Sequence, residues 1–74
     1  MSVTVYTKPA CVQCQATERA LRKAGIPFTV VDLTKDPAAL EVVKRMGHQQ
    51  APVVVTDTES WAGFHPGRIK ALAA

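Results

Sequence analysis

Both cysteines of this chain lie in a single Cys11-Val12-Gln13-Cys14 motif, at the point where a strand pattern gives way to a helix pattern. The preceding segment Val3–Tyr6 alternates and is β-branched and aromatic, which predicts a short strand. Pro9 interrupts the strand because proline cannot donate a hydrogen bond to a sheet. Helical periodicity then starts at Cys11. We therefore expect a strand, a short loop and a helix whose first turn holds both sulfurs.

The helix that starts at Cys11 is expected to end at Gly25, because glycine readily adopts the left-handed conformation that terminates many helices. Pro27 supports this stop. The apolar residues of the helix fall near one face, which we expect to pack on the sheet. The residues of this expected buried face are Val12, Ala16, Ala20, Leu21 and Ala24.

A second strand and a second helix follow. Phe28–Asp32 has the β-branched composition of a strand. Asp36 followed by Pro37 predicts a helix start, since aspartate caps helices well and proline fits the first helical position. Gly47 predicts the end of this helix. The residues that the helix is expected to bury are Leu40, Val43 and Met46.

The rest of the chain predicts two strands and a last helix. Pro52 precedes the run Val53–Thr56, and proline is tolerated where it opens a strand. Glu59–Trp61 is expected to be a short edge strand and Gly67–Leu72 lies in the last helix. The order βαβαββα favours an α/β fold with a mixed four-stranded sheet flanked by three helices, in which the first two strands run parallel.

Length and charge narrow the class of protein. A chain of 74 residues can bury roughly 60% of its unfolded surface, so we expect one domain over residues 1–74. The net charge of +3 comes from basic residues spread along the chain, whereas nucleic-acid binding normally needs a clustered basic stripe. No apolar stretch is long enough to span a membrane, and the start lacks a signal-peptide pattern. We expect a cytoplasmic monomer that binds neither nucleic acid nor membranes.

The spacing of the cysteines indicates redox chemistry. A disulfide across a two-residue gap restricts the unfolded chain very little, and a lone C-x-x-C in a chain without a secretion signal is typical of redox or metal sites. A structural zinc site needs about four ligands, and His48 and His65 are too far apart for a finger pattern. We expect no metal, although a metal site and inert thiols remain alternatives. The two histidines have no assigned role.

Cys11 is the expected nucleophile. The free N–H groups and the dipole at a helix start stabilise a thiolate, and Lys8 adds a positive charge nearby. We expect Cys11 to be more exposed than Cys14. Cys11 would then attack a substrate disulfide, and Cys14 would resolve the mixed disulfide and leave an internal disulfide that an upstream reductant reopens.

Three further features are carried by separated segments, which are Val5–Cys14, Gln50–Val55 and Trp61–Pro66. The first resembles the active-site segment of the NrdH redoxins, small glutaredoxin-like proteins of the thioredoxin superfamily. The second resembles the proline-containing strand entry of that family, and the third its Trp-Ser-Gly-Phe-Arg-Pro segment. The resemblance covers nearly the whole chain and implies a thioredoxin/glutaredoxin-like fold.

The resemblance also implies a function. NrdH redoxins donate electrons from their dithiol to class Ib ribonucleotide reductase, and thioredoxin reductase recharges them. The implied partners are therefore that reductase and the large subunit of ribonucleotide reductase, with no bound cofactor and NADPH used only indirectly. The resemblance further implies a cis Ala51–Pro52 bond that places Ala51 beside Cys11. From the residues alone a trans bond is expected, since only about 5–6% of X–Pro bonds in folded proteins are cis.

Two other functions stay open. A glutathione-dependent glutaredoxin would also resemble this chain at Lys8 and at the proline loop. Such proteins commonly carry two glycines and a following aspartate that hold glutathione, whereas Ser60–Phe64 offers one glycine and two large aromatics, so we expect impaired glutathione binding. The other alternative is a non-catalytic interaction module whose C-x-x-C acts as a redox or zinc switch.

The remaining candidate residues surround the cysteines. Trp61, Gly63 and Phe64 are expected to bind partners or to lock the loop near the site, and the two aromatics fit a core position beside the last helix equally well. Val12 and Gln13 are expected to tune partner contact and redox poise. Three departures from the family pattern are expected to remove hydrogen bonds and a helix-start carboxylate. They are Ala62, His65 and Gly67.

Overall fold

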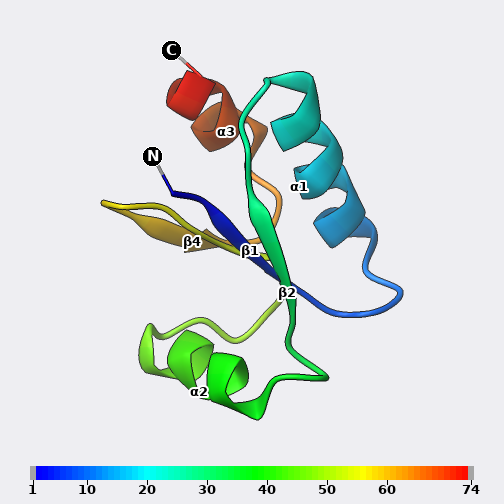
Figure 1. Cartoon of the computed structure of the whole chain (residues 1–74), viewed down its shortest axis with the longest axis vertical. Coiled ribbons are helices and arrows are strands. Elements are labelled where there is room, and N and C mark those ends of the chain that lie inside the picture. The colour runs from blue at the N-terminus through cyan, green and yellow to red at the C-terminus, as the bar shows by residue number, and fades with distance from the viewer. Residues whose placement is uncertain (1, 74) are drawn as a thin grey trace.

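The computed structural model describes residues 2–73 and contains, within them, four strands and three helices in the predicted order (Figure 1). Their bounds agree with the predicted ones to within two residues. The elements are β1 (Thr4–Thr7), α1 (Val12–Lys23), β2 (Thr29–Asp32), α2 (Pro37–Arg45), β3 (Val53–Val55), β4 (Ser60–Ala62) and α3 (Pro66–Ala73). No helix in this described part of the chain is long and apolar enough to cross a membrane.

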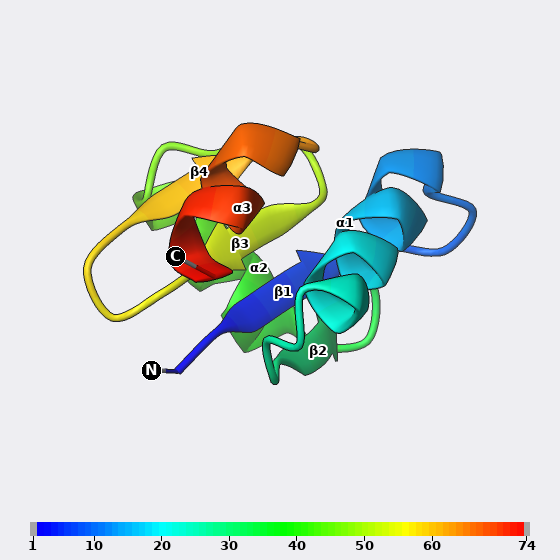
Figure 2. The same cartoon turned by 90° about the horizontal axis from the view of Figure 1, so that it is seen from above.

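The strands form one mixed sheet in the order β2-β1-β3-β4. β1 pairs with β2 in parallel, while β3 pairs antiparallel with both β1 and β4. Helices α1 and α3 lie together on one face of the sheet, and α2 lies on the other (Figures 1 and 2). The predicted sheet with three flanking helices is confirmed. The loop from β1 to α1, which ends at Cys11, leaves the sheet at the end of a central strand.

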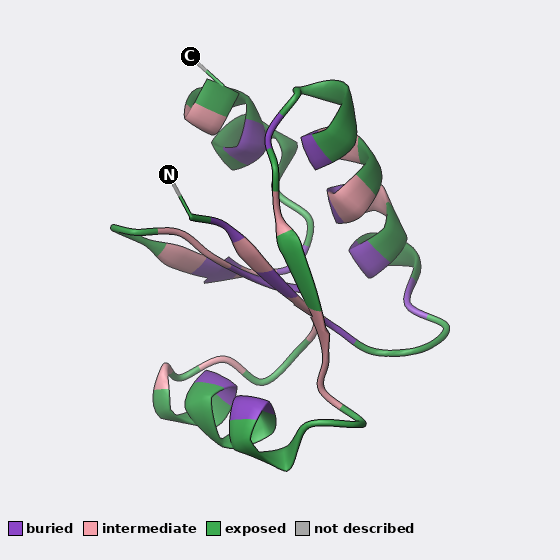
Figure 3. Cartoon of the chain, viewed as in Figure 1, coloured by how far each residue is buried: buried purple, intermediate pink, exposed green. Residues whose placement is uncertain are grey.

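The main core fills the space between the sheet and the α1/α3 layer. Alternation along β1 turns Val5 into this layer, and the register pairs it with Val54 on β3. Leu21 of α1 is fully buried in this core, and the buried part of α1 lies on the side of the helix that faces the sheet (Figure 3). The members of this cluster are Val3, Val5, Leu21, Ile26, Val54, Trp61 and Ile69.

The buried face of α1 differs from the predicted one. Val12 is 80% exposed and Ala24 is also exposed, while the buried residues are Cys14, Thr17 and Leu21. These three are spaced by three and four positions, so they share one face of the helix. Val12 precedes Cys14 by two residues and therefore points to the opposite side. The prediction went wrong because it counted apolar residues and left out a buried threonine.

The buried face of α2 also differs from the prediction. Ala39 and Val43 are buried, whereas Leu40 is 37% exposed and Met46 is only partly buried. Ala39 and Val43 lie four positions apart and form the stripe that faces the sheet. Leu40 lies beside this stripe and lines an open groove instead. The small Ala39 thus lies against the sheet where a larger residue was expected.

The cap of α2 carries a first testable prediction. Asp36 Oδ1 accepts a hydrogen bond of 3.0 Å from the Ala39 N–H, with Pro37 at the first position of the helix. Asp36→Ala is expected to lower the free energy of unfolding by about 0.5–2 kcal/mol, measured by urea denaturation. Asp36→Ser keeps an acceptor at this position and should remain close to the parent. Equal losses in both variants would contradict the cap.

Candidate functional site

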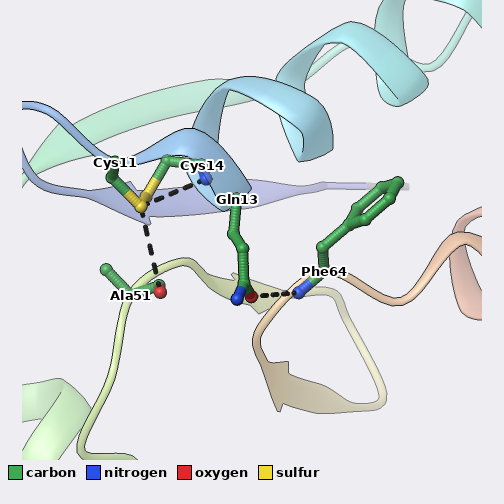
Figure 4. Close-up of a disulfide and its surroundings, with 5 residues drawn as sticks. All are labelled: Cys11, Gln13, Cys14, Ala51 and Phe64. Atoms are coloured by element: carbon green, nitrogen blue, oxygen red, sulfur yellow. Dashed lines mark hydrogen bonds between the residues drawn. A yellow bond between two sulfur atoms is a disulfide. The ribbon is translucent and has the colours of Figure 1, made fainter.

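Cys11 and Cys14 form a disulfide at the start of α1, with their Cα atoms 5.2 Å apart (Figure 4). Cys11 is the N-cap residue of the helix and has an extended backbone, while Cys14 lies in the first turn. The chain reaches Cys11 through Ala10, whose φ of +55° places it in the left-handed region. This sharp turn connects the end of β1 to the helix start. The sequence-predicted dithiol is therefore present in its oxidised form.

Cys11 lies where a thiolate is stabilised. Its sulfur accepts a hydrogen bond of 3.1 Å from the Cys14 N–H, and it caps the end of α1 to which the helix dipole gives a positive partial charge. Both features favour the anionic form of Cys11 when the disulfide is reduced. Lys8 lies exposed on the preceding loop.

The two cysteines differ in their access to solvent. Cys11 is 8% exposed and Cys14 is 2% exposed. Cys11 is therefore the more exposed of the two, as predicted, although both residues are buried. A substrate disulfide can therefore approach Cys11 more easily than Cys14, as the predicted roles of nucleophile and resolving thiol require.

The Ala51–Pro52 segment lies directly against the cysteines. The bond is cis, as the resemblance implied and against the expectation from the residues alone. The Ala51 carbonyl oxygen is 3.9 Å from the Cys11 sulfur (Figure 4). A disulfide sulfur carries no proton, so this is a contact in the oxidised protein. When Cys11 is reduced and protonated, the same carbonyl is placed to accept from its thiol, and this bond is lost when the thiolate forms.

A third segment reaches the site from the turn between β4 and α3. The Gly63 N–H donates to the Pro52 carbonyl at 2.7 Å, and the Phe64 N–H donates to Gln13 Oε1 at 3.2 Å. Gln13 lies between the two cysteines in the sequence. The structure therefore brings together the dithiol, the Ala51–Pro52 segment and this turn, which are far apart in the chain.

Comparison with known proteins settles the family. The sequence profile of the glutaredoxin family matches residues 3–61. The chain belongs to this family. It is 40% identical over 72 residues to the glutaredoxin-like protein NrdH of Escherichia coli (strain K12), covering 97% of this chain and 89% of that protein. The NrdH of Lactococcus lactis subsp. cremoris (strain MG1363) is 35% identical over 71 residues, covering 96% and 99%.

A solved structure supports the same assignment. The NrdH-redoxin from Escherichia coli superposes with a TM-score of 0.94 at 40% identity, covering 97% of this chain and 95% of that one. The resemblance to NrdH redoxins and the thioredoxin-like fold are confirmed. As a glutaredoxin-like NrdH protein with a dithiol at a helix start, the protein is a thiol-disulfide oxidoreductase.

The chemistry of such a dithiol is an exchange of disulfides. In the roles predicted from the sequence, the Cys11 thiolate would attack one sulfur of a substrate disulfide, and the other substrate sulfur would leave as a thiolate. Cys14, deprotonated, would then attack Cys11 in the mixed disulfide and release the second substrate sulfur. The substrate would gain two electrons and two protons, and the protein would keep the Cys11–Cys14 disulfide.

One departure from the NrdH pattern has less effect than expected. His65 Nε2 lies 2.9 Å from the Ala62 carbonyl oxygen. Because a carbonyl only accepts, Nε2 carries the proton and donates. His65 therefore supplies a hydrogen bond at a position where we expected a loss. The first turn of α3 contains no acidic residue, and Gly67 stands where the family pattern has one.

Trp61 and Phe64 have different surroundings. Trp61 is 4% exposed and belongs to the core. The Arg68 guanidinium lies 5.3 Å from the centre of its ring, and Arg68 also forms an ion pair with Glu59 at 3.3 Å. The Trp61 side chain is therefore not part of an exposed rim. Phe64 is 37% exposed and Val12 is 80% exposed, so these two present apolar surface.

A groove next to Ala51 was missed by the sequence analysis. It has a volume of about 390 Å³, with Leu33, Leu40 and Val43 among its apolar residues and Lys8 at its edge. Its residues come from several separate segments of the chain, so no local sequence pattern predicts the groove. Ala51 also lines the groove, and its carbonyl oxygen contacts the Cys11 sulfur at 3.9 Å.

His48 and Asp32 have structural partners. His48 Nε2 lies 3.0 Å from Ser60 Oγ and connects the end of α2 to β4. At the end of β2, the hydroxyl and the N–H of Thr34 both donate to Asp32 Oδ1, at 2.6 and 2.8 Å. These two bonds lower the pKa of Asp32. Within residues 2–73, no three His, Cys, Asp or Glu side chains are grouped closely enough to hold a metal ion.

Proposed function

We propose that the protein is a dithiol electron donor for class Ib ribonucleotide reductase and that thioredoxin reductase recharges it with electrons from NADPH. The supporting observation is the turn that adjoins the dithiol. In glutathione-dependent glutaredoxins this region commonly holds glutathione, whereas here Gly63 and Phe64 bond to Pro52 and Gln13. The NrdH-redoxin from Escherichia coli is described as having a thioredoxin-like activity profile, which supports the same electron source.

The proposed cycle needs no bound cofactor. NADPH delivers electrons to the reductase, and the reductase opens the Cys11–Cys14 disulfide. The reduced dithiol then opens a disulfide on the large subunit of ribonucleotide reductase by the exchange described above. This work belongs in the cytoplasm, where deoxyribonucleotides are made and where thiols are kept reduced.

The electron source gives a direct test of the proposal. Reduction of insulin disulfides is measured with thioredoxin reductase and NADPH, and in parallel with glutathione, glutathione reductase and NADPH. We expect the first rate to exceed the second by roughly tenfold or more, the factor that about 1.4 kcal/mol of lost binding produces. A second assay replaces insulin with the oxidised large subunit of a class Ib ribonucleotide reductase.

The alternatives predict other outcomes of this test. The groove beside Ala51, with Lys8 at its edge, is the observation that favours a glutathione-dependent glutaredoxin. A clear preference for glutathione would therefore overturn the proposal in favour of that function. Absence of turnover with either reductase, together with stoichiometric zinc, would identify a non-catalytic module instead.

A further inference from the structure

We propose that Gln13 is a positioning residue that holds the Gly63–Phe64 turn against the dithiol and thereby favours protein disulfides over small disulfides. The inference rests on the thiol-disulfide exchange of the proposed function, and it is independent of which reductase or acceptor takes part. It gives Gln13, the second residue between the cysteines, a role in substrate preference.

The first support is the direction of the Gln13 side chain. Gln13 extends from α1 toward the chain that follows β4, and its Oε1 accepts from the Phe64 N–H at 3.2 Å (Figure 4). The two residues are 51 positions apart. Within residues 2–73, no other side-chain hydrogen bond joins α1 to the turn between β4 and α3. The motif that carries the chemistry is thus itself attached to this turn.

The second support is the shape of the turn. Gly63 has a φ of +87°, which strains any residue that carries a Cβ. A Cβ at this position would lie 3.5 Å from Gln13 Oε1, so the glutamine packs directly over the glycine. On its other side the Gly63 N–H donates to the Pro52 carbonyl at 2.7 Å. The turn is therefore held on one side by Pro52 and on the other by Gln13.

The consequence concerns two exposed apolar side chains. Val12 adjoins Cys11 and is 80% exposed, and Phe64 on the held turn is 37% exposed. The bond from Gln13 fixes the turn that carries Phe64 relative to the helix start that carries Val12. A protein partner then meets a preformed surface, and ordering this turn adds no cost to binding. A small disulfide that contacts only the Cys11 sulfur gains nothing from this surface.

The test compares two oxidants in single-turnover experiments. The protein is reduced with dithiothreitol, desalted and mixed either with insulin or with the small uncharged aromatic disulfide 2,2′-dithiodipyridine. In each case the dithiol loses two electrons and becomes the Cys11–Cys14 disulfide, while the oxidant becomes two thiols. The measured quantity is the ratio of the second-order rate constant for insulin to that for the small disulfide.

Three variants make the test specific. Gln13→Met keeps the length of the side chain and removes the acceptor, so this ratio is expected to fall by roughly two- to tenfold, which corresponds to one hydrogen bond. Gln13→Glu keeps an acceptor and should restore the parent ratio. Gln15→Met makes the same change at an exposed glutamine on the same helix, and it should leave both rate constants at the parent values.

The outcomes are distinguishable. An unchanged ratio in Gln13→Met, or equal losses with both oxidants, overturns the positioning role. Failure of Gln13→Glu to restore the ratio does the same. A parent protein that reduces neither oxidant would instead contradict the thiol-disulfide exchange itself. Thermal denaturation of all variants verifies that they are folded.

Discussion

A chain with Cys14 replaced by serine is expected to stop midway through the reaction and to remain covalently attached to its substrate. The Cys11 thiolate can still attack, because the N–H of residue 14 that faces its sulfur belongs to the backbone and survives the change. Without the second thiol, the mixed disulfide has no internal route to product. Turnover should fall by roughly 10³-fold or more, as for loss of a residue that takes part in bond exchange.

Non-reducing mass spectrometry measures this outcome directly. Incubation of Cys14→Ser with an oxidised partner should give a one-to-one adduct that dithiothreitol reverses. The control is Cys11→Ser, which lacks the more exposed sulfur and should give neither turnover nor adduct. If Cys11→Ser formed the adduct and Cys14→Ser did not, the assignment of nucleophile and resolving thiol would be reversed, and equal adducts in both variants would contradict any such assignment.

Local patterns in the sequence were sufficient to predict the elements and their ends. Asp36 with Pro37 indicated the start of α2, and the structure has Asp36 as its cap. Gly25 and Gly47 indicated two helix ends, and both have positive φ. Such signals can be read locally because the hydrogen bonds and backbone conformations that they report involve residues within a few positions of each other.

The faces of the helices were harder to predict. Thr17 is fully buried and Val12 is largely exposed, the reverse of what their polarity suggests. Which face of a helix is buried depends on the contacts that the helix makes with distant parts of the chain. In α1 the buried face is the one that contains Cys14. On α2, the buried residues are Ala39 and Val43, while the neighbouring Leu40 lines the open groove. Polarity alone does not carry this information.

The arrangement of the site depends on contacts between distant parts of the chain. The dithiol and its helix start could be predicted because strand, loop and helix are adjacent in sequence. The approach of Ala51 to Cys11 spans 40 positions and the bond from Phe64 to Gln13 spans 51. No periodicity reports such pairs. The first was expected only through the family resemblance, and the second was found only in the structure.

Replacement of Leu21 with alanine is expected to cause the largest loss of stability. Leu21 is fully buried in the cluster that joins α1 to the sheet, and a leucine-to-alanine change in such a core costs about 2–5 kcal/mol. A domain of this size has a total stability of roughly 4–11 kcal/mol, so the change removes a large share of it. Urea denaturation of the oxidised protein, so that the disulfide is the same in all samples, measures the loss.

The matched control is Leu40→Ala, which makes the same chemical change at a residue that is 37% exposed. Leu40 lines the open groove, where solvent can fill the space of the removed side chain, and we expect a loss of about 1 kcal/mol. The contrast between the two leucines therefore measures burial rather than residue type. Equal losses at both positions would mean that α2 buries Leu40 in solution, as its polarity suggested, and that the observed face of α2 is wrong.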